Sequence, residues 1–172
     1  TQRLITLVED IIKLSQLDER AVELERTEAD LHAIARDVAE RLHSAAEQNG
    51  IHIEVFGGPA VVTGVPRILD EMIFNLADNA VKYSRAGGSV RITAGMQAGS
   101  AFIEVADDGI GIPERDRERV FERFYRVDKS RSKQIGGTGL GLSIVKHGAA
   151  FHNAHVALQS REGEGTTVRI TF

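Results

Sequence analysis

The chain has 172 residues, 42% of them hydrophobic, which is enough for a substantial core in one domain with an appendage. Its 21 Lys and Arg residues are outnumbered by 25 Asp and Glu residues, so no basic field favours nucleic acid as a partner. The lack of cysteine excludes disulfides and thiolate metal sites and fits a reducing compartment such as the cytoplasm. No apolar run is long enough to span a membrane, and no signal-peptide pattern opens the chain. Because Thr1 already lies in a helical pattern, we expect a fragment of a longer protein.

An amphipathic helix is expected at the start of the chain, over residues 1–17. Two heptads are too short to be stable alone, so this helix packs either in a helical bundle or dimer, or on the rest of its own chain. The charged stretch that follows, up to residue 30, has few large apolar side chains, and we interpret it as a linker. The helix carries an apolar stripe at three- and four-residue steps: Leu4, Leu7, Val8, Ile11, Ile12 and Leu14.

The rest of the chain mixes helices and strands without strict alternation. Residues 31–48 return to a helical period, with Asp30 placed to cap the start and Asn49-Gly50 to end the helix. We therefore expect an α/β fold, a two-layer sandwich in which one mixed β-sheet is covered by helices on one face. Strands are predicted between turn signals at residues 51–55, 60–63, 90–97, 101–106, 155–160 and 166–172.

A helix over residues 66–84 has two faces of different chemistry. One face is apolar and belongs to the core, whereas the other presents Glu71, Asn75 and Asn79 at four-residue steps, followed by Lys82 and Tyr83. Asparagine is a poor residue for the middle of a helix, so two of them need a reason. A neutral amide oxygen can hold Mg²⁺ without adding negative charge, which suits an ion that arrives with a polyphosphate. The alternative is that the two amides only bond neighbouring backbone groups.

A first glycine-rich stretch, residues 105–113 (VADDGIGIP), leaves a predicted strand through Asp107 and Asp108. Glycine at Gly109 and Gly111 permits positive φ or a close approach of backbone to a flat ligand. A carboxylate at the end of a strand can accept a hydrogen bond from the adenine N6 amine, whereas guanine would present a carbonyl oxygen there. A structural turn remains an alternative, and so does a calcium loop, although the ligand spacing of a dedicated calcium loop is not met.

A second glycine-rich stretch, residues 136–145 (GGTGLGLSIV), opens a helix whose free N–H groups attract phosphate. It matches neither a Walker loop nor a dinucleotide fingerprint. Between the two stretches, residues 114–135 place three aromatic residues among eight Lys and Arg and five Asp and Glu residues. The interleaved acids argue against a nucleic-acid patch. We interpret this segment as a mobile lid over a triphosphate, with a simple solvated loop as the alternative.

In this order, the stretches NLADNAVKYS, VADDGIGIP, VFERFYRVD and GGTGLGLSIV resemble the N box, first glycine box, F box and second glycine box of sensor histidine kinases. These kinases are Bergerat-fold ATPases, as are gyrase-type topoisomerases and a heat-shock chaperone. The resemblance implies a catalytic ATP-binding domain over residues 31–172. Residues 1–19 resemble the C-terminal helix of the dimerisation and histidine-phosphotransfer domain, and residues 20–30 its linker. It also implies a homodimeric parent protein, with or without a membrane anchor, whose kinase domain is cytoplasmic.

The resemblance further implies binding of ATP with Mg²⁺ and transfer of the γ-phosphoryl group to a histidine, from which a response-regulator aspartate takes it in two-component signal transduction. Asn75 and Asn79 would hold Mg²⁺, Lys82 would reach a phosphate, and Tyr83 would line the nucleotide site. Asp107 would bind adenine N6. Either Arg123 or Arg126 would contact the γ-phosphate. The remaining positions would shape the pocket or border the phosphates: Gly109, Gly111, Ile112, Gly137, Thr138, Gly139, Leu140 and Gly141.

One departure from the family pattern is the missing H box, a histidine followed by an acidic residue and a downstream proline. We therefore predict that the chain binds ATP with Mg²⁺ but does not phosphorylate itself at the family's site. Three alternatives remain: an ATP-hydrolysing clamp, which would usually have glutamate at Asn75; a noncatalytic nucleotide- or partner-binding module; and a serine kinase of the same fold. None of the six histidines has the H-box context: His32, His43, His52, His147, His152 and His155.

Overall fold

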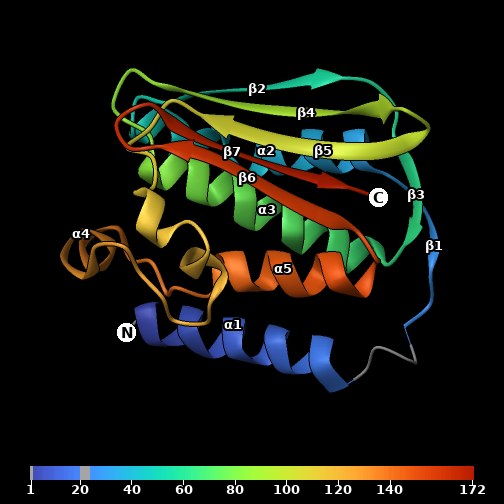
Figure 1. Cartoon of the computed structure of the whole chain (residues 1–172), viewed down its shortest axis with the longest axis horizontal. Helices are drawn as coiled ribbons and strands as arrows, with labels where there is room; N and C mark the ends of the chain where they lie inside the picture. Colours follow the sequence, from blue (N-terminus) through green and yellow to red (C-terminus); the bar gives the residue numbers. More distant parts are fainter. Residues whose placement is uncertain (1, 20–23) are drawn as a thin grey trace.

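The computed structural model describes residues 2–19 and 24–172, and Figure 1 shows a layer of strands above a layer of helices. The main sheet has five strands in the order β2-β4-β5-β7-β6, with β2 and β4 parallel and the other neighbours antiparallel. Its strands are β2 (His52–Gly57), β4 (Ser89–Gln97), β5 (Ser100–Asp107), β6 (His155–Arg161) and β7 (Gly165–Thr171). The expected α/β two-layer sandwich with one mixed sheet is thus confirmed.

Three long helices cover one face of this sheet: α2 (Leu31–Gln48), α3 (Pro66–Tyr83) and α5 (Gly141–Phe151). The start of α2 is capped as predicted, because the Asp30 carboxylate accepts the backbone N–H of His32 at 3.0 Å. Pro66 occupies the first turn of α3, where its missing N–H costs no helical hydrogen bond. Between β5 and α5 the chain forms two short 3₁₀ turns, η1 (Glu114–Asp116) and η2 (Arg119–Phe121), and a short helix, α4 (Lys129–Ile135).

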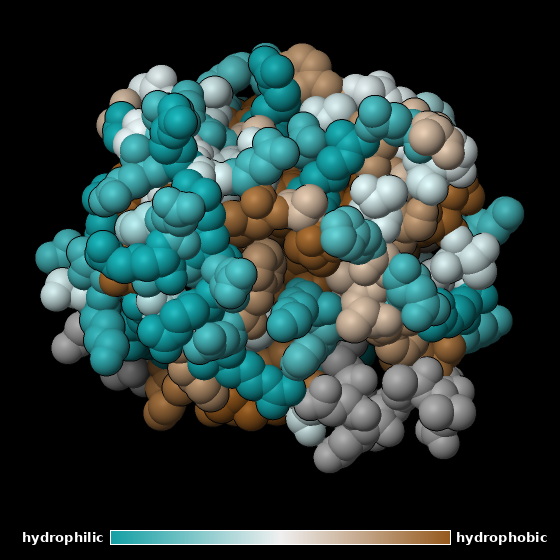
Figure 2. All heavy atoms as spheres, viewed as in Figure 1, coloured by the Kyte–Doolittle hydropathy of each residue, from teal (hydrophilic) through white to brown (hydrophobic). Residues whose placement is uncertain are grey.

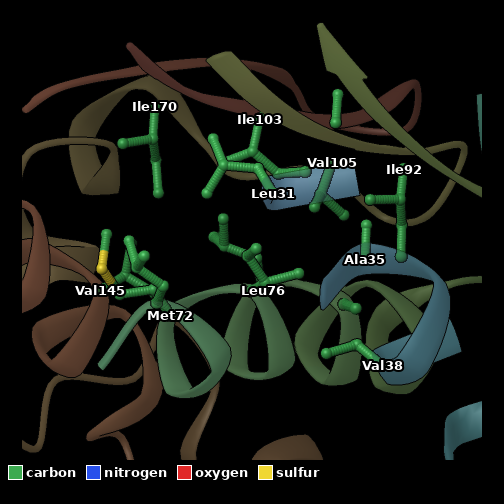
Figure 3. Packing of buried hydrophobic residues seen from close by; sticks show 14 of the residues in the cluster. Leu31, Ala35, Val38, Met72, Leu76, Ile92, Ile103, Val105, Val145 and Ile170 are labelled. Atoms are coloured by element: carbon green, nitrogen blue, oxygen red, sulfur yellow. The ribbon is translucent and has the colours of Figure 1, made fainter. Parts of the chain in front are cut away.

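The sheet and the helices enclose one apolar core. Figure 3 shows Ile103 and Ile170 of the sheet facing α3, on the side that carries Met72 and Leu76, whereas Ile92 faces Ala35 of α2. All six are almost completely buried. Burying one such side chain contributes roughly 1.5–3 kcal/mol. The predicted apolar face of α3 therefore anchors that helix and fixes its opposite, polar face toward the lid side.

A strand occupies part of the segment for which a linker was predicted. β1 (Thr27–Asp30) pairs antiparallel with β3 (Val61–Gly64) in a separate two-stranded sheet. Ala29 is buried, and the Asp30 carboxylate also accepts the N–H of Ala60 at 2.8 Å. One buried alanine is too weak a signal for a strand, and the pairing depends on the distant β3. The division of the chain at residues 19 and 30 stays a prediction, and residues 20–23 lie outside the described residues.

The first helix, α1 (Gln2–Glu19), lies outside the helix layer and packs on α5 (Figure 1). Leu14, with Leu7 beside it, meets Leu140 and Ile144 in a small second core. The opposite side of α1 stays apolar and exposed, and Figure 2 shows apolar atoms along this lower edge of the molecule. These exposed residues are Leu4, Ile5, Val8, Ile11 and Ile12. In the described part of the chain, no helix is both long and apolar enough to cross a membrane.

Candidate nucleotide-binding site

A cavity of about 330 Å³ lies among the C-terminal half of α3, the end of β5, the lid segment and α1. At one end it is lined by Asn75 and Asn79 together with the glycine-rich turn before α5. At the other end it is lined by Asp107 and by apolar side chains of the sheet, among them Val105 and Val168. The cavity therefore combines a polar, glycine-rich part, where the asparagines meet Gly141, with an apolar part where Asp107 stands among residues of the sheet.

The two asparagines face the start of α5. A Cβ added to Gly141 would lie 3.1 Å from Oδ1 of Asn75 and 3.5 Å from Nδ2 of Asn79, so both amides lie directly against this glycine. The Asn75 amide nitrogen donates to the carbonyl of Glu71 at 2.7 Å. A bond to neighbouring backbone was the alternative role considered for the two asparagines. That bond uses the nitrogen and leaves Oδ1 turned toward α5. The backbone bond and an oxygen available for a cation are thus compatible.

Lys82 lines the same cavity but is held by its own helix. Its Nζ lies 2.6 Å from a carboxylate oxygen of Asp78, one turn earlier. Asp78 also lines the cavity, and sequence reasoning did not select it. The four-residue spacing of an acid and a lysine was the signal for this pair. Tyr83, at the end of α3, lines the cavity as expected.

Asp107 stands at the end of β5 with its carboxylate held by backbone. The N–H of Gly109 donates to Oδ1 at 2.9 Å, and the backbone of Thr166 on β7 also bonds the carboxylate. Burial raises the pKa of Asp107 from 3.8 to about 6, and these backbone bonds oppose part of the rise. At neutral pH the group is therefore an ionised acceptor in an apolar pocket, which suits recognition of an exocyclic amine.

The next residue, Asp108, fastens this loop to the sheet. Its carboxylate accepts the N–H of Ser89 at 3.0 Å and the Ser89 hydroxyl at 3.1 Å, at the first residue of β4. A Cβ on Gly88 would lie 2.4 Å from the same carboxylate. Asp108 thus holds in place the strand end that carries Asp107. The sequence shows that Asp107 and Asp108 are adjacent, but it does not reveal that Asp108 bonds Ser89.

The two glycines of the first box, Gly109 and Gly111, let the backbone around Asp107 pack closely against neighbouring segments. Gly109 does not line the cavity; its N–H fixes Asp107, and a Cβ there would lie 2.3 Å from the carbonyl oxygen of Tyr83. Gly111 lines the cavity with φ +67°, and a Cβ there would lie 1.9 Å from the carbonyl oxygen of Arg161. Ile112 also lines the cavity, and its N–H donates to the Ser160 hydroxyl at 2.8 Å.

The F-box segment forms the base of the lid. Arg126 lines the cavity, whereas Arg123 lies 2.9 Å from Nε2 of His147 on α5 and does not line it. The Tyr125 hydroxyl donates to the buried Asp116 carboxylate, so Tyr125 anchors the segment on η1. Phe124 has φ +64°, an unusual value for a bulky side chain, and 56% of its surface is exposed. Of the two arginines predicted for the γ-phosphate, the structure brings only Arg126 to the cavity.

The second glycine box borders the polar end of the cavity. Gly137, Thr138, Gly139 and Gly141 line it. Leu140 does not, because its side chain is completely buried against Leu14 and Ile144, so it can offer a ligand only its backbone. Sequence reasoning also missed the wall that α1 contributes, because helical periodicity does not reveal which partner a helix packs on. The α1 residues that line the cavity are Thr6, Glu9, Asp10 and Lys13.

Comparison with known proteins agrees with this geometry. The family model described as "Histidine kinase-, DNA gyrase B-, and HSP90-like ATPase" matches residues 64–172. The fold and site thus define an ATP-binding domain, and the chain belongs to this ATPase family, as a catalytic domain of the histidine kinase type. The resemblance drawn from the four boxes is confirmed.

Two relatives by sequence are sensor kinases. The chain is 41% identical to the sensor-like histidine kinase SenX3 of Mycolicibacterium smegmatis, over 100% of the chain and 45% of that protein. It is 35% identical to the sensor histidine kinase WalK of Bacillus subtilis, over 100% of the chain and 29% of that protein. The chain therefore spans less than half the length of these curated relatives.

Two solved structures share the fold and 30% of the sequence. Full-length ShkA in complex with AMPPNP superposes with a TM-score of 0.84, covering 98% of this chain and 35% of that one. The mycobacterial sensor histidine kinase MprB superposes with a TM-score of 0.74, covering 86% of this chain and 96% of that one.

Proposed function

We propose that this domain binds ATP with Mg²⁺ and transfers the γ-phosphoryl group to a histidine outside the chain. One observation carries the proposal: a single cavity has paired amides and a glycine-rich helix start in one part, and the partly buried carboxylate of Asp107 among apolar residues in another. The free N–H groups at the helix start suit the phosphates, and the carboxylate among apolar residues suits adenine. Asn75 and Asn79 would hold Mg²⁺, which would neutralise phosphate charge.

The donor set fits Mg²⁺ brought by a nucleotide rather than a resident metal. No cluster of three or more His, Asp or Glu side chains suited to a metal occurs among the described residues. Neutral amide oxygens bind such an ion only weakly by themselves, so the nucleotide phosphates must supply further ligands. The chain's own contribution is then to fix Oδ1 of Asn75 beside Gly141 and to keep the lid segment over the phosphates.

The proposed reaction needs positioning more than acid–base chemistry. The bond between the γ-phosphorus and its bridging oxygen breaks, a phosphorus–nitrogen bond forms to a histidine ring, and ADP remains. Arg126 and Lys82 would neutralise charge on the phosphates, Lys82 after leaving Asp78. Asn75 stands where a hydrolysing clamp would need a carboxylate base, and Glu71, one turn earlier, is paired with Lys13 at 3.1 Å. Kinase chemistry is therefore favoured over hydrolysis.

The partners follow from the same proposal. The exposed apolar side of α1 supports packing in a helical bundle, which would be the histidine-containing dimerisation domain of a homodimeric parent. A response regulator would then take the phosphoryl group. Since ATP is supplied in the cytoplasm, the domain would work there.

The experiment is a transfer assay with γ-labelled ATP and Mg²⁺. The acceptor is the separately produced dimerisation domain of the SenX3 relative, with a histidine-to-alanine version of it as the control. We expect acid-labile label on the acceptor and none on this chain. Label on the chain itself would contradict an external acceptor. Steady release of inorganic phosphate without labelled acceptor would instead favour a hydrolysing clamp.

A further inference from the structure

Helix α1 places an acidic residue in the wall of the cavity, at the end assigned above to the phosphates. The Thr138 hydroxyl, in the middle of the second glycine box, donates to Oδ2 of Asp10 at 2.8 Å. Asp10 is only 9% exposed, although it belongs to an outer helix, and both residues line the cavity. Residues 128 positions apart in sequence thus meet at this contact.

Among the described residues, Asp10 forms no salt bridge, although Lys13, Lys82, Arg126 and Arg131 line the same cavity. Its partner is a neutral hydroxyl, as far as the described side chains go. Lys13, one turn further along α1, is joined to Glu71 of α3 at 3.1 Å. Glu9, next to Asp10, adds a second acid to the same wall. Glu9 and Asp10 outnumber Lys13 on this wall, so the formal charge that α1 brings to the cavity is negative.

The docked position of α1 is held by more than this one bond. Leu14 is 4% exposed and packs on Leu140 and Ile144, the residues that continue the glycine box into α5. The Lys13–Glu71 pair adds a second polar contact, to the helix that carries both asparagines. These contacts keep the Asp10 carboxylate beside Thr138.

We propose that Asp10 is a specificity-determining residue of the nucleotide site, which favours a diphosphate over a triphosphate while α1 is docked. The inference rests on the proposed function, because it takes the glycine-rich end as the phosphate end. A hydroxyl has one hydrogen, so Thr138 donates either to Asp10 or to a phosphate oxygen. A terminal phosphate group also brings negative charge toward a carboxylate that forms no salt bridge among the described residues, in a partly buried site where repulsion is stronger than in water.

A consequence for signalling follows from reciprocity. If docking of α1 lowers the affinity for ATP relative to ADP by some factor, then bound ATP lowers the docking equilibrium of α1, relative to bound ADP, by the same factor. Nucleotide exchange at the cavity and movement of the helix are coupled through the Asp10–Thr138 contact. Displacement of α1 by the rest of its bundle would thereby admit ATP.

The test is calorimetric titration of the whole chain with a nonhydrolysable ATP analogue and with ADP, both with Mg²⁺. Asp10→Asn keeps the size of the side chain and an acceptor for Thr138 but removes the charge. We expect it to raise affinity for the ATP analogue about tenfold and to change affinity for ADP by less than about twofold. Glu28→Gln is the control for loss of one negative charge, since Glu28 is exposed on β1, away from the lid in Figure 1.

Each outcome decides the matter. An unchanged ratio of the two affinities in Asp10→Asn, or the same change in Glu28→Gln, overturns the proposal while leaving nucleotide binding intact. Absence of any nucleotide binding by the wild-type chain would refute the proposed function itself. Asp10→Ala serves as a second variant, and we expect it to raise affinity for the ATP analogue more than affinity for ADP.

Discussion

Gly109 lies directly against the main chain of Tyr83, so that a Cβ at position 109 would stand 2.3 Å from the Tyr83 carbonyl oxygen. The same Cβ would stand 2.8 Å from Oδ1 of Asp107, the carboxylate assigned to adenine. One glycine therefore lets the end of α3 and the residue that we propose to bind adenine approach each other, because no larger residue fits between them.

Gly109→Ala should displace Asp107 and weaken binding of an ATP analogue at least tenfold. Overpacking of this kind also lowers the free energy of unfolding by about 1–3 kcal/mol. Calorimetry and denaturant unfolding measure the two effects. The matched control is Gly58→Ala, because a Cβ at Gly58 meets no atom within 4 Å. Equal losses of binding in both variants would contradict the role given to Gly109.

Binding of adenosine should depend on pH through Asp107. Its pKa is raised to about 6 by burial, and only the ionised carboxylate accepts from the adenine amine without reorganisation. Affinity should be constant above about pH 7 and fall up to tenfold per unit below pH 6. Adenosine is the probe because it has no phosphate that titrates in this range. Asp107→Asn should bind more weakly with a flat profile; a profile that matches wild type would exclude Asp107 as the group responsible.

Asn79→Ala should remove the effect of Mg²⁺ on nucleotide affinity. Its amide lies beside Gly141, in the part of the cavity that we propose for the phosphates, 3.5 Å from the position of a Cβ on that glycine. We expect Mg²⁺ to strengthen binding of an ATP analogue at least about tenfold in wild type and less than twofold in the variant. Adenosine binding should stay unchanged, which checks the fold. Asn49→Ala, at the end of α2, is the control that should retain the Mg²⁺ effect.

His152 should make stability depend on pH. Its Nε2 accepts the N–H of Val65 at 3.0 Å, and its Nδ1 bonds the carbonyl of Gly148 at 2.7 Å, so the buried ring is neutral. Burial lowers the pKa of His152 below 6.5. A depressed histidine pKa means that the stabilising contribution is complete above pH 6.5 and is lost as pH falls below it, toward the folded-state pKa.

The measurement is the free energy of unfolding of wild type and His152→Gln at pH 7.5 and pH 5. The variant should be less stable than wild type by about 1–3 kcal/mol at pH 7.5. This difference should be smaller at pH 5, by up to about 1.4 kcal/mol for each pH unit between 6.5 and the lowered pKa of His152. Asp107, with its raised pKa, acts in the opposite direction but is present in both proteins. His43→Gln, at an exposed site, should change stability by less than about 0.5 kcal/mol. If the difference in the free energy of unfolding between wild type and His152→Gln did not change with pH, the stabilising role of neutral His152 would be refuted.

Most elements could be predicted because their signals are local. Helix α2 follows from an apolar period between a capping aspartate and Asn-Gly, and its observed bounds, Leu31–Gln48, are those predicted. The paired asparagines and the DDGIGIP turn are visible in sequence because each places an unusual residue inside a regular pattern. Strand β1 was missed, since its stability comes from β3, more than thirty residues later.

Sequence reasoning selected most of the residues that we propose to contact the nucleotide, but it missed several of the residues that hold them in place. Asp107 and the two asparagines could be selected because their residue types and positions alone suggest a nucleotide site. Asp108 depends on Ser89, and Asp10 on Thr138, and such partners are set by how distant elements meet. The role of Lys82 at a phosphate stays a prediction, and its pairing with Asp78 one turn earlier was not foreseen.

The central claim is adenine-selective, Mg²⁺-assisted nucleotide binding in this cavity. Its most direct measurement is calorimetric titration of the chain with a nonhydrolysable ATP analogue, with and without Mg²⁺, beside the matching GTP analogue and Asp107→Asn. The account predicts that wild type binds the ATP analogue at least tenfold more tightly than the GTP analogue, and that Asp107→Asn loses this preference. No binding, or equal affinity for both nucleotides in wild type, would contradict it.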